Sequence, residues 1–117
     1  MKDFSNFLTR LGNLHDCTIT LFEWRPEQNS ISFEIEDLYF NFEGLPEYPG
    51  AQSGRLVLEE VQLVSIDVRD LERPLRIDDF TVEANTPSAA AVSVTLQPRG
   101  RISIRCQRAT FPDVGLP

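Results

Sequence analysis

Three adjacent residues near the N-terminus, His15, Asp16 and Cys17, bring together an imidazole, a carboxylate and a thiol. An adjacent His and Asp can both ligate a metal ion, and a Cys two residues from a His can act as a nucleophile beside its base. Because His15 is the only histidine, metal sites built on several histidines or on four Cys and His ligands lack their ligands. We expect a structural joint in which His15 and Asp16 hydrogen-bond where a helix meets a strand, and a small enzyme using His15 stays an alternative.

A second group of chemically capable residues is acidic. Residues 23–60 hold nine carboxylates and two arginines, whereas residues 97–117 hold four arginines and one carboxylate. The acids could coordinate calcium, form an acid/base pair, lie on solvated strand faces, or form a surface for a basic protein. The net charge of −7 disfavours direct binding of nucleic acid, because phosphates would be repelled. The predicted partner-binding residues are Glu34, Glu36, Asp37, Glu43, Glu47 and Tyr48.

Segment 41–54 is rich in glycine and proline and is predicted to be a long loop. It mixes Phe42, Leu45 and Tyr48 with two glutamates, a combination that recognition surfaces use because aromatic groups anchor and charges steer. Alternatively, Phe42 and Leu45 cover the open end of a sheet. The chain has neither of the glycine motifs that bind nucleotides, so we predict no cofactor and no metal.

The elements that position these residues follow from apolar spacing. Apolar residues recur with helical spacing over residues 3–11, where Asp3 can cap the start and Gly12 can supply a left-handed end. From Cys17 the period changes to two, which indicates strands. In the segment from residue 30 to 42, Ile31, Phe33 and Ile35 point inward. The apolar parity shifts at Asp37, as a bulge or bend would require, and the pattern continues through Leu38, Phe40 and Phe42.

The second half of the chain also alternates. Apolar parity changes twice between residues 55 and 68, which predicts a strand that is bent or split by a tight turn. Two further strands are joined by Gln97-Pro98-Arg99-Gly100, whose Pro and Gly positions favour a type I turn. Cys106 falls on the inward face of the last strand. We expect Cys17 and Cys106 to be buried free thiols, with a disulfide as the second reading.

These patterns predict a mainly β fold with a minor α component. It is an antiparallel β-sandwich or half-open barrel of about six to seven strands with one short N-terminal helix. We expect one domain over residues 1–117, with a helix near 3–11, a β-rich body over 14–111 and a short tail at 112–117. The N-terminus lacks a continuous apolar run, so we expect a cytoplasmic protein without membrane contact. A homodimer through exposed strand edges stays open.

Three stretches, "NLHDCTITLFEW", "GRLVLEEVQLVSIDV" and "VSVTLQPRGRISIRCQRATF", together resemble small immunity proteins of bacterial polymorphic-toxin and contact-dependent inhibition systems. The resemblance lies in a His-Asp-small motif entering the first strand and a glycine turn before a strand that contains a cysteine. The matching residues are His15, Asp16, Cys17, Gly100 and Cys106. Cys17 stands where that family more often has Ala or Ser.

The resemblance implies a bacterial cytoplasmic protein without enzyme activity that binds and blocks a cognate toxin, often a nuclease with a basic active site. An acidic protein would associate rapidly with a basic groove and occupy the place of phosphate. The sequence therefore predicts a toxin inhibitor that acts through its acidic surface. The alternative outside this class is a small-ligand-binding β-barrel with Phe33, Phe40 and Phe80 around its cavity.

Overall fold

Eight strands form one antiparallel sheet, which is not closed, in the part of the chain that the computed structural model describes, residues 1–69, 73–85 and 89–117. One helix, α1 (Lys2–Arg10), precedes it, and three short 3-10 turns are η1 (Gly12–Leu14), η2 (Pro26–Gln28) and η3 (Phe40–Phe42). The strands are β1 (Thr18–Arg25), β2 (Ser30–Ile35), β3 (Gly54–Glu59), β4 (Leu63–Asp67), β5 (Leu75–Asn85), β6 (Ala90–Gln97), β7 (Arg101–Cys106) and β8 (Arg108–Thr110).

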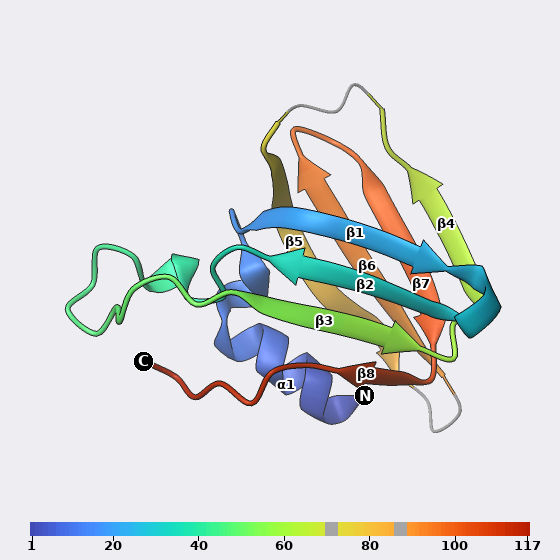
Figure 1. Cartoon of the computed structure of the whole chain (residues 1–117), viewed down its shortest axis with the longest axis horizontal. Helices are drawn as coiled ribbons and strands as arrows, with labels where there is room; N and C mark the ends of the chain where they lie inside the picture. The colour runs from blue at the N-terminus through green and yellow to red at the C-terminus, as the bar shows by residue number, and fades with distance from the viewer. Residues whose placement is uncertain (70–72, 86–88) are drawn as a thin grey trace.

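The sheet bends into two layers (Figure 1). The strand order is β4-β7-β6-β5-β1-β2-β3-β8, so β1, β2, β3 and β8 form the front layer and β4 to β7 the rear one. β1 pairs with β5 only at Thr18 and Ile19, after which the two strands diverge. The architecture is therefore a mainly β fold with one N-terminal helix, as predicted. It has eight strands rather than six to seven, because the last predicted strand is divided at Gln107 into β7 and β8.

Besides the β1–β5 pairing, a bend in the chain after β3 and another after β7 also connect the two layers. β3 runs through Glu60 into β4, and β7 runs through Gln107 into β8, so each chain segment crosses from one layer to the other. Hydrogen bonds continue across the bend, where Gln62 N donates to Arg105 O at 2.7 Å and Gln107 N donates to Glu59 O at 3.2 Å. The predicted split of the segment at residues 55–68 is confirmed.

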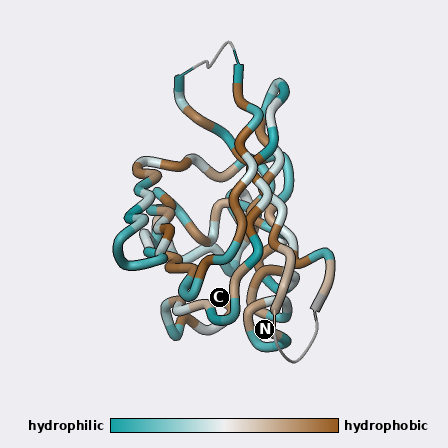
Figure 2. Tube along the Cα trace, turned by 90° about the vertical axis from the view of Figure 1, so that its right-hand side faces the viewer, coloured by the Kyte–Doolittle hydropathy of each residue, from teal (hydrophilic) through white to brown (hydrophobic). Residues whose placement is uncertain are grey.

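The interior is filled by side chains from both layers and from α1. Phe33 of β2 meets Phe80 of β5 edge to face at 5.1 Å between ring centroids, and Phe4 of α1 meets Phe80 at 6.0 Å. Phe33, Phe80 and Phe4 are all buried. Hydrophobic and hydrophilic stretches alternate along much of the chain (Figure 2). Phe40, the third phenylalanine of the ligand-barrel alternative, lies in η3 and is only half-buried.

The predicted N-terminal helix and the predicted free thiols are both present, but the predicted N-cap residue is wrong. The helix is confirmed, but Met1 rather than Asp3 is its N-cap residue, and Asp3 lies in the first turn. Gly12 does take a left-handed conformation, with φ 69°. Cys17 and Cys106 are buried and free, so the first reading of the thiols is confirmed and the disulfide is wrong.

Two local strand and turn predictions are wrong. The continuation of the second strand through Leu38 to Phe42 is a turn followed by η3, because the Asp37 carboxylate accepts a hydrogen bond from Tyr39 N and turns the chain. The β6–β7 hairpin is confirmed, but its turn differs from the predicted type I turn. The Gln97–Pro98 peptide bond is cis, and Leu96 N donates to Gly100 O at 2.9 Å.

No helix among the described residues combines the length and the apolar character that a membrane crossing would need.

Candidate functional site

The segment between α1 and β1 takes an uncommon left-handed path. Gly12, Asn13 and Leu14 have φ values of 69°, 54° and 56°, and Asp16 follows with 63°. Asn and Asp tolerate this conformation, but for Leu14 it costs roughly 1–2 kcal/mol, so the surroundings must hold the segment in place. Leu14 is fully buried, and Asn41 Nδ2 donates to Leu11 O at 3.1 Å just before the turn. Packing of one apolar side chain and one amide thus fixes the direction in which the chain enters the sheet.

Hydrogen bonds tie this joint to the rear layer. Asp16 N donates to Ile77 O at 2.8 Å, and Ile77 N donates to Cys17 O at 2.9 Å. The His15 Nδ1 lies 2.7 Å from Asp78 O, which accepts its hydrogen, and Gln97 Nε2 donates to Asp16 Oδ1. His15 and Asp16 therefore hydrogen-bond where the helix meets the sheet.

His15 is also the basic group among three carboxylates. Its side chain is 49% exposed, with Nε2 3.5 Å from Asp16 Oδ2 and Nδ1 3.7 Å from Asp78 Oδ1. The hydrogen bond to the backbone of Asp78 raises the pKa of His15 above 6.5, and the charges of Asp16, Asp78 and Asp79 add to the rise, while desolvation opposes it. The imidazole is thus biased toward its charged form.

Cys17 points away from His15 and into the core. Its thiol is buried and donates to Asp37 O at 3.3 Å. Burial raises the pKa of Cys17 to about 12, and the Asp37 and Asp16 carboxylates add to the effect. Burial likewise raises the pKa of Cys106 to about 11. Since the thiolate is the nucleophilic form, neither position favours nucleophilic catalysis.

Asp37, one of the predicted partner-binding residues, is only 7% exposed and serves the loop that follows it. Its Oδ1 accepts hydrogen bonds from Tyr39 N and Gln52 N, both at 3.0 Å, and its Oδ2 accepts one from Tyr48 Oη at 2.5 Å. The hydrogen bond to this carboxylate raises the pKa of Tyr48 to about 12, with a smaller contribution from desolvation. Asp37 and Tyr48 therefore hold the two ends of segment 38–53 together, and their polar groups are already used inside the protein.

Glu34, another predicted partner-binding residue, lies on a charge-balanced face. The outer face of the front layer carries three carboxylate–arginine pairs. They are Glu34 with Arg55 at 3.1 Å, Glu23 with Arg25 at 2.7 Å, and Glu59 with Arg108 at 3.2 Å. The Thr110 hydroxyl first and the Arg108 guanidinium second lower the pKa of Glu59. This face therefore does not gather negative charge.

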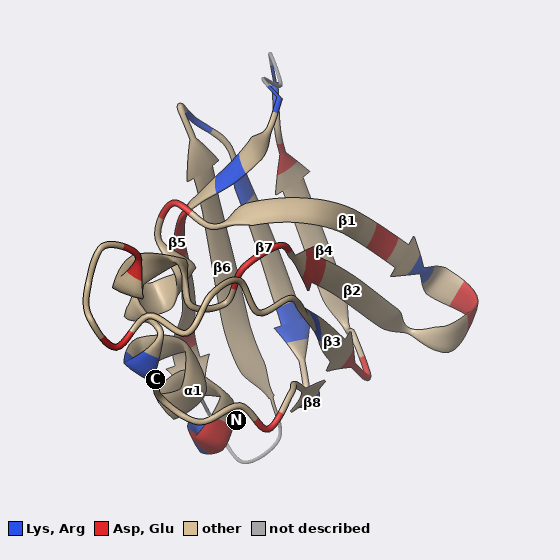
Figure 3. Cartoon of the chain, turned by 60° about the vertical axis from the view of Figure 1, so that its left-hand side comes forward, with Lys and Arg blue, Asp and Glu red and all other residues tan. Residues whose placement is uncertain are grey.

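Negative charge gathers instead at one end of the sheet, which we call the acidic end. Its carboxylates come from the joint, the end of β2, segment 43–47 and β5, and they belong to Asp16, Glu36, Glu43, Glu47, Asp78 and Asp79. Glu36 N donates to Thr18 O at 3.0 Å, which places Glu36 beside the joint. Glu43 follows η3, which the Asn41 amide ties to Leu11 just before η1. Figure 3 shows acidic residues on the loops around this end of the molecule.

Three of the predicted partner-binding residues, Glu36, Glu43 and Glu47, belong to the acidic end and are exposed. Asp78 and Asp79 were missed as site residues. The pairing of β1 with β5 places them beside the joint, and the spacing of residues along the chain does not predict that pairing. One sequence signal was available: two adjacent aspartates interrupt the alternation between Ile77 and Phe80, and the β5–β6 register shifts there.

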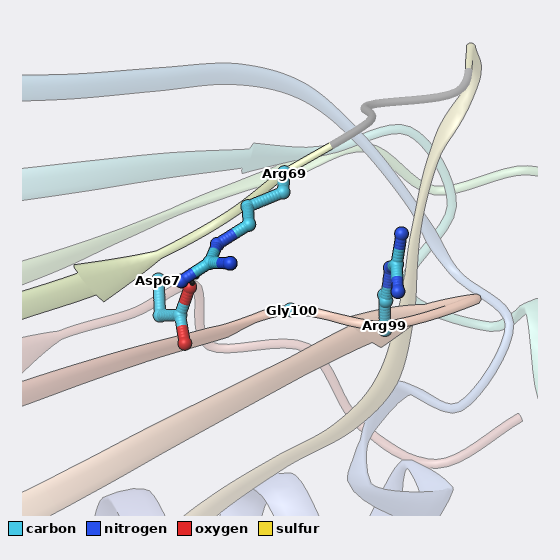
Figure 4. A pocket seen from close by; sticks show the side chains of 4 residues that line it. All are labelled: Asp67, Arg69, Arg99 and Gly100. Atoms are coloured by element: carbon cyan, nitrogen blue, oxygen red, sulfur yellow. Dashed lines mark ion pairs between the residues drawn. The ribbon is translucent and has the colours of Figure 1, made fainter.

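The opposite sign of charge collects at the β6–β7 hairpin and the neighbouring ends of β4 and β5. One surface hollow is lined by Asp67, Arg69, Arg99 and Gly100, with Arg69 Nε 3.3 Å from Asp67 Oδ1 (Figure 4). A second is lined by Arg73, Pro74, Arg76, Gln97 and Pro98. Gly100, with φ 128°, shapes the turn between β6 and β7. Among the residues that the structure describes, no three His, Cys, Asp or Glu side chains are grouped as a metal site would require.

Comparisons with known proteins bear on the fold alone. No protein-family model matches the sequence, and no curated protein matches it. The structure is similar to the crystal structure of an uncharacterized protein from Neisseria gonorrhoeae, with a TM-score of 0.59 and 10% sequence identity. The match covers 86% of this chain and 93% of that chain.

Proposed function

We propose that this protein is a non-catalytic binding protein of the immunity type, which neutralises a cognate bacterial toxin through its acidic end. The supporting observation is the state of the carboxylates there. Glu36, Glu43 and Glu47 form no ion pair with any residue in the described ranges. Their charge is therefore available to a partner, unlike that of Glu34, which Arg55 balances.

The acidic end suits a partner with a basic groove, such as a nuclease. A groove that binds phosphate is lined by cations, and a surface with several carboxylates can steer toward it and occupy the place of the phosphates. Leu45 is 49% exposed and lies between Glu43 and Glu47 in the chain, so an apolar anchor accompanies the charges. Interfaces commonly combine such an anchor with a charged rim.

The first step of the test is to identify the partner. The product of the neighbouring reading frame is expressed with and without this protein, and growth of the host is measured. We expect the neighbouring product alone to arrest growth and co-expression to restore it. Restored growth should require a physical complex of the two purified proteins. An arrest that persists on co-expression would contradict the proposal.

The second step asks which carboxylates bind. A triple variant, Glu36→Gln, Glu43→Gln and Glu47→Gln, removes three charges from the acidic end. The matched control, Glu23→Gln, Glu34→Gln and Glu59→Gln, removes three charges from the balanced face and changes net charge equally. We expect the association rate to fall roughly 10-fold or more for the first triple and much less for the control. Equal effects of the two triples, or an affinity that is indifferent to salt, would contradict binding through the acidic end.

A further inference from the structure

The outer edge of β4 differs from the other edge of the sheet. β4 is the terminal strand of the rear layer, and its described pairing is with β7 only (Figure 1). Alternate residues of such a strand direct their N–H and C=O groups outward. At the opposite edge β8 has three residues, and Arg108 there pairs with Glu59 and Glu60. Short length and charge protect β8 from further pairing.

β4 has five residues and carries no charged side chain over residues 63–66. Leu63 is 60% exposed and Ile66 is 47% exposed, and Trp24, at the end of β1, is 46% exposed. One surface hollow lies where the β1–β2 connection approaches the start of β4, and its lining includes Trp24, Leu63 and Val64. An unprotected strand edge beside exposed apolar groups is a site at which another strand can add to the sheet.

The register between β4 and β7 shows which strand fits. Val64 pairs with Ile104 and Ile66 with Ile102 on the interior face, whereas Leu63, Ser65 and Asp67 pair with Arg105, Ser103 and Arg101 on the outer face. A two-fold axis through Ser65 would place a second, antiparallel β4 with Val64 opposite the copy's Ile66 and Ser65 opposite the copy's Ser65. Because the axis passes through a residue, each residue on the interior face of β4 pairs with an interior-face residue of the copy. The interior faces of the two copies therefore lie on the same side of the combined sheet.

The rows formed across four strands by this pairing are self-complementary. Each interior row contains Ile104, Val64, Ile66 and Ile102, so all of its members are apolar. The central outer row contains two copies of Ser103 and Ser65. Each remaining outer row contains, in order, Arg101 and Asp67 of one copy and then Leu63 and Arg105 of the other. Asp67 is thus next to the Arg101 of its own copy and two strands from the Arg105 of the other copy, so opposite charges lie near one another.

We propose that two copies of this chain associate through antiparallel pairing of their β4 strands about Ser65, forming one continuous sheet. The interface is isologous, as in most two-fold dimers. It is independent of the acidic end and of the function proposed for that end.

The first experiment measures the oligomeric state. Sedimentation equilibrium of the full chain at increasing concentration should show a mass that rises from 13.3 kDa toward twice that value. Ile66→Lys places a charge in an apolar row and should keep the protein monomeric. Leu116→Lys adds the same charge at an exposed leucine far along the chain from β4 and should dimerise normally. A wild-type chain that stays monomeric up to about 1 mM, or equal weakening by both variants, would overturn the proposal.

The second experiment tests the register. Residues directly opposite in an antiparallel pair have Cβ atoms about 4.5–5.5 Å apart, so oxidised Ser65→Cys should form a disulfide-linked dimer on a denaturing gel. Leu63→Cys is the control on the same face, because its two copies would lie four residues apart along the strands, about 13 Å. The native Cys17 and Cys106 are buried and should not interfere. Crosslinking of both variants, of Leu63→Cys alone or of neither would overturn the register.

Discussion

At the scale of single residues, Asp37 shows how a buried carboxylate can organise a long segment that contains no strand. Replacing Asp37 with Ala leaves the amides of Tyr39 and Gln52 without their acceptor. Because a buried donor without a partner costs about 1–3 kcal/mol, we expect Asp37→Ala to lower the free energy of unfolding by roughly 2–3 kcal/mol.

Chemical denaturation measures this change, and Glu47→Ala is the control in the same loop. Glu47 is exposed, so its replacement should change the free energy of unfolding by less than about 0.5 kcal/mol. Similar values for the two variants would show that Asp37 does not anchor the segment.

His15 makes a pH-dependent contribution whose sign follows from its surroundings. The hydrogen bond to the Asp78 backbone and the neighbouring carboxylates raise its pKa above 6.5 in the folded state. The charged imidazole therefore stabilises the fold fully below the unfolded pKa, and this stabilisation is lost as pH rises through the folded pKa. We expect His15→Gln to lower the Tm more at about pH 5 than at about pH 8. An NMR titration that places the His15 pKa below 6.5 would contradict this.

Residue types alone predicted part of the candidate site. Glu36, Glu43 and Glu47 are exposed as expected, because each lies at a strand end or in a loop of turn-forming residues. Sequence reasoning could not distinguish them from Glu34, whose partner Arg55 is supplied by the β2–β3 register. Nor could it show that the Asp37 carboxylate accepts hydrogen bonds from its own loop, since two of its three donors lie more than ten residues away in the chain.

At the scale of elements, the start of β3 depends on a glycine that touches the loop and the C-terminal segment. A Cβ on Gly54 would lie 2.5 Å from Leu38 Cδ1 and 2.9 Å from Pro112 Cγ. We expect Gly54→Ala to lower the free energy of unfolding by about 1–3 kcal/mol through overpacking.

Gly115→Ala is the matched control, because a Cβ there would meet nothing within 4 Å. Both variants add one methyl group, and chemical denaturation compares them directly. If Gly54→Ala is as stable as Gly115→Ala, the close approach at the start of β3 is not a constraint on the fold.

Alternation of period two predicted the strands well where one face is buried, as in β2, β6 and β7. It also predicted the split between β3 and β4, because the apolar parity changes there. It failed from Leu38 to Phe42, where apolar residues still alternate but the Asp37 carboxylate binds Tyr39 N and turns the chain. The pairing of β4 with β7 and of β3 with β8 is non-local, and residue spacing holds no signal for it.

At the scale of the whole molecule, the two thiols should report global unfolding. Cys17 and Cys106 are buried, and burial raises their pKa values to about 12 and about 11. We therefore expect almost no reaction with a thiol reagent at about pH 8 until the protein unfolds, and a labelling rate that follows denaturant concentration. Rapid labelling of either thiol in the native protein would show that the core opens locally. Cys17→Ser and Cys106→Ser, used singly, assign the rates to each residue.

The two bends between the layers also bear on how the chain folds as it is synthesised. Residues 18–59 build most of the front layer, but its edge strand comes from residues 108–110. Residues 75–106 build most of the rear layer, and its edge strand comes from residues 63–67. A nascent chain on the ribosome therefore cannot complete the front layer until the last strand has emerged, however early its first three strands form.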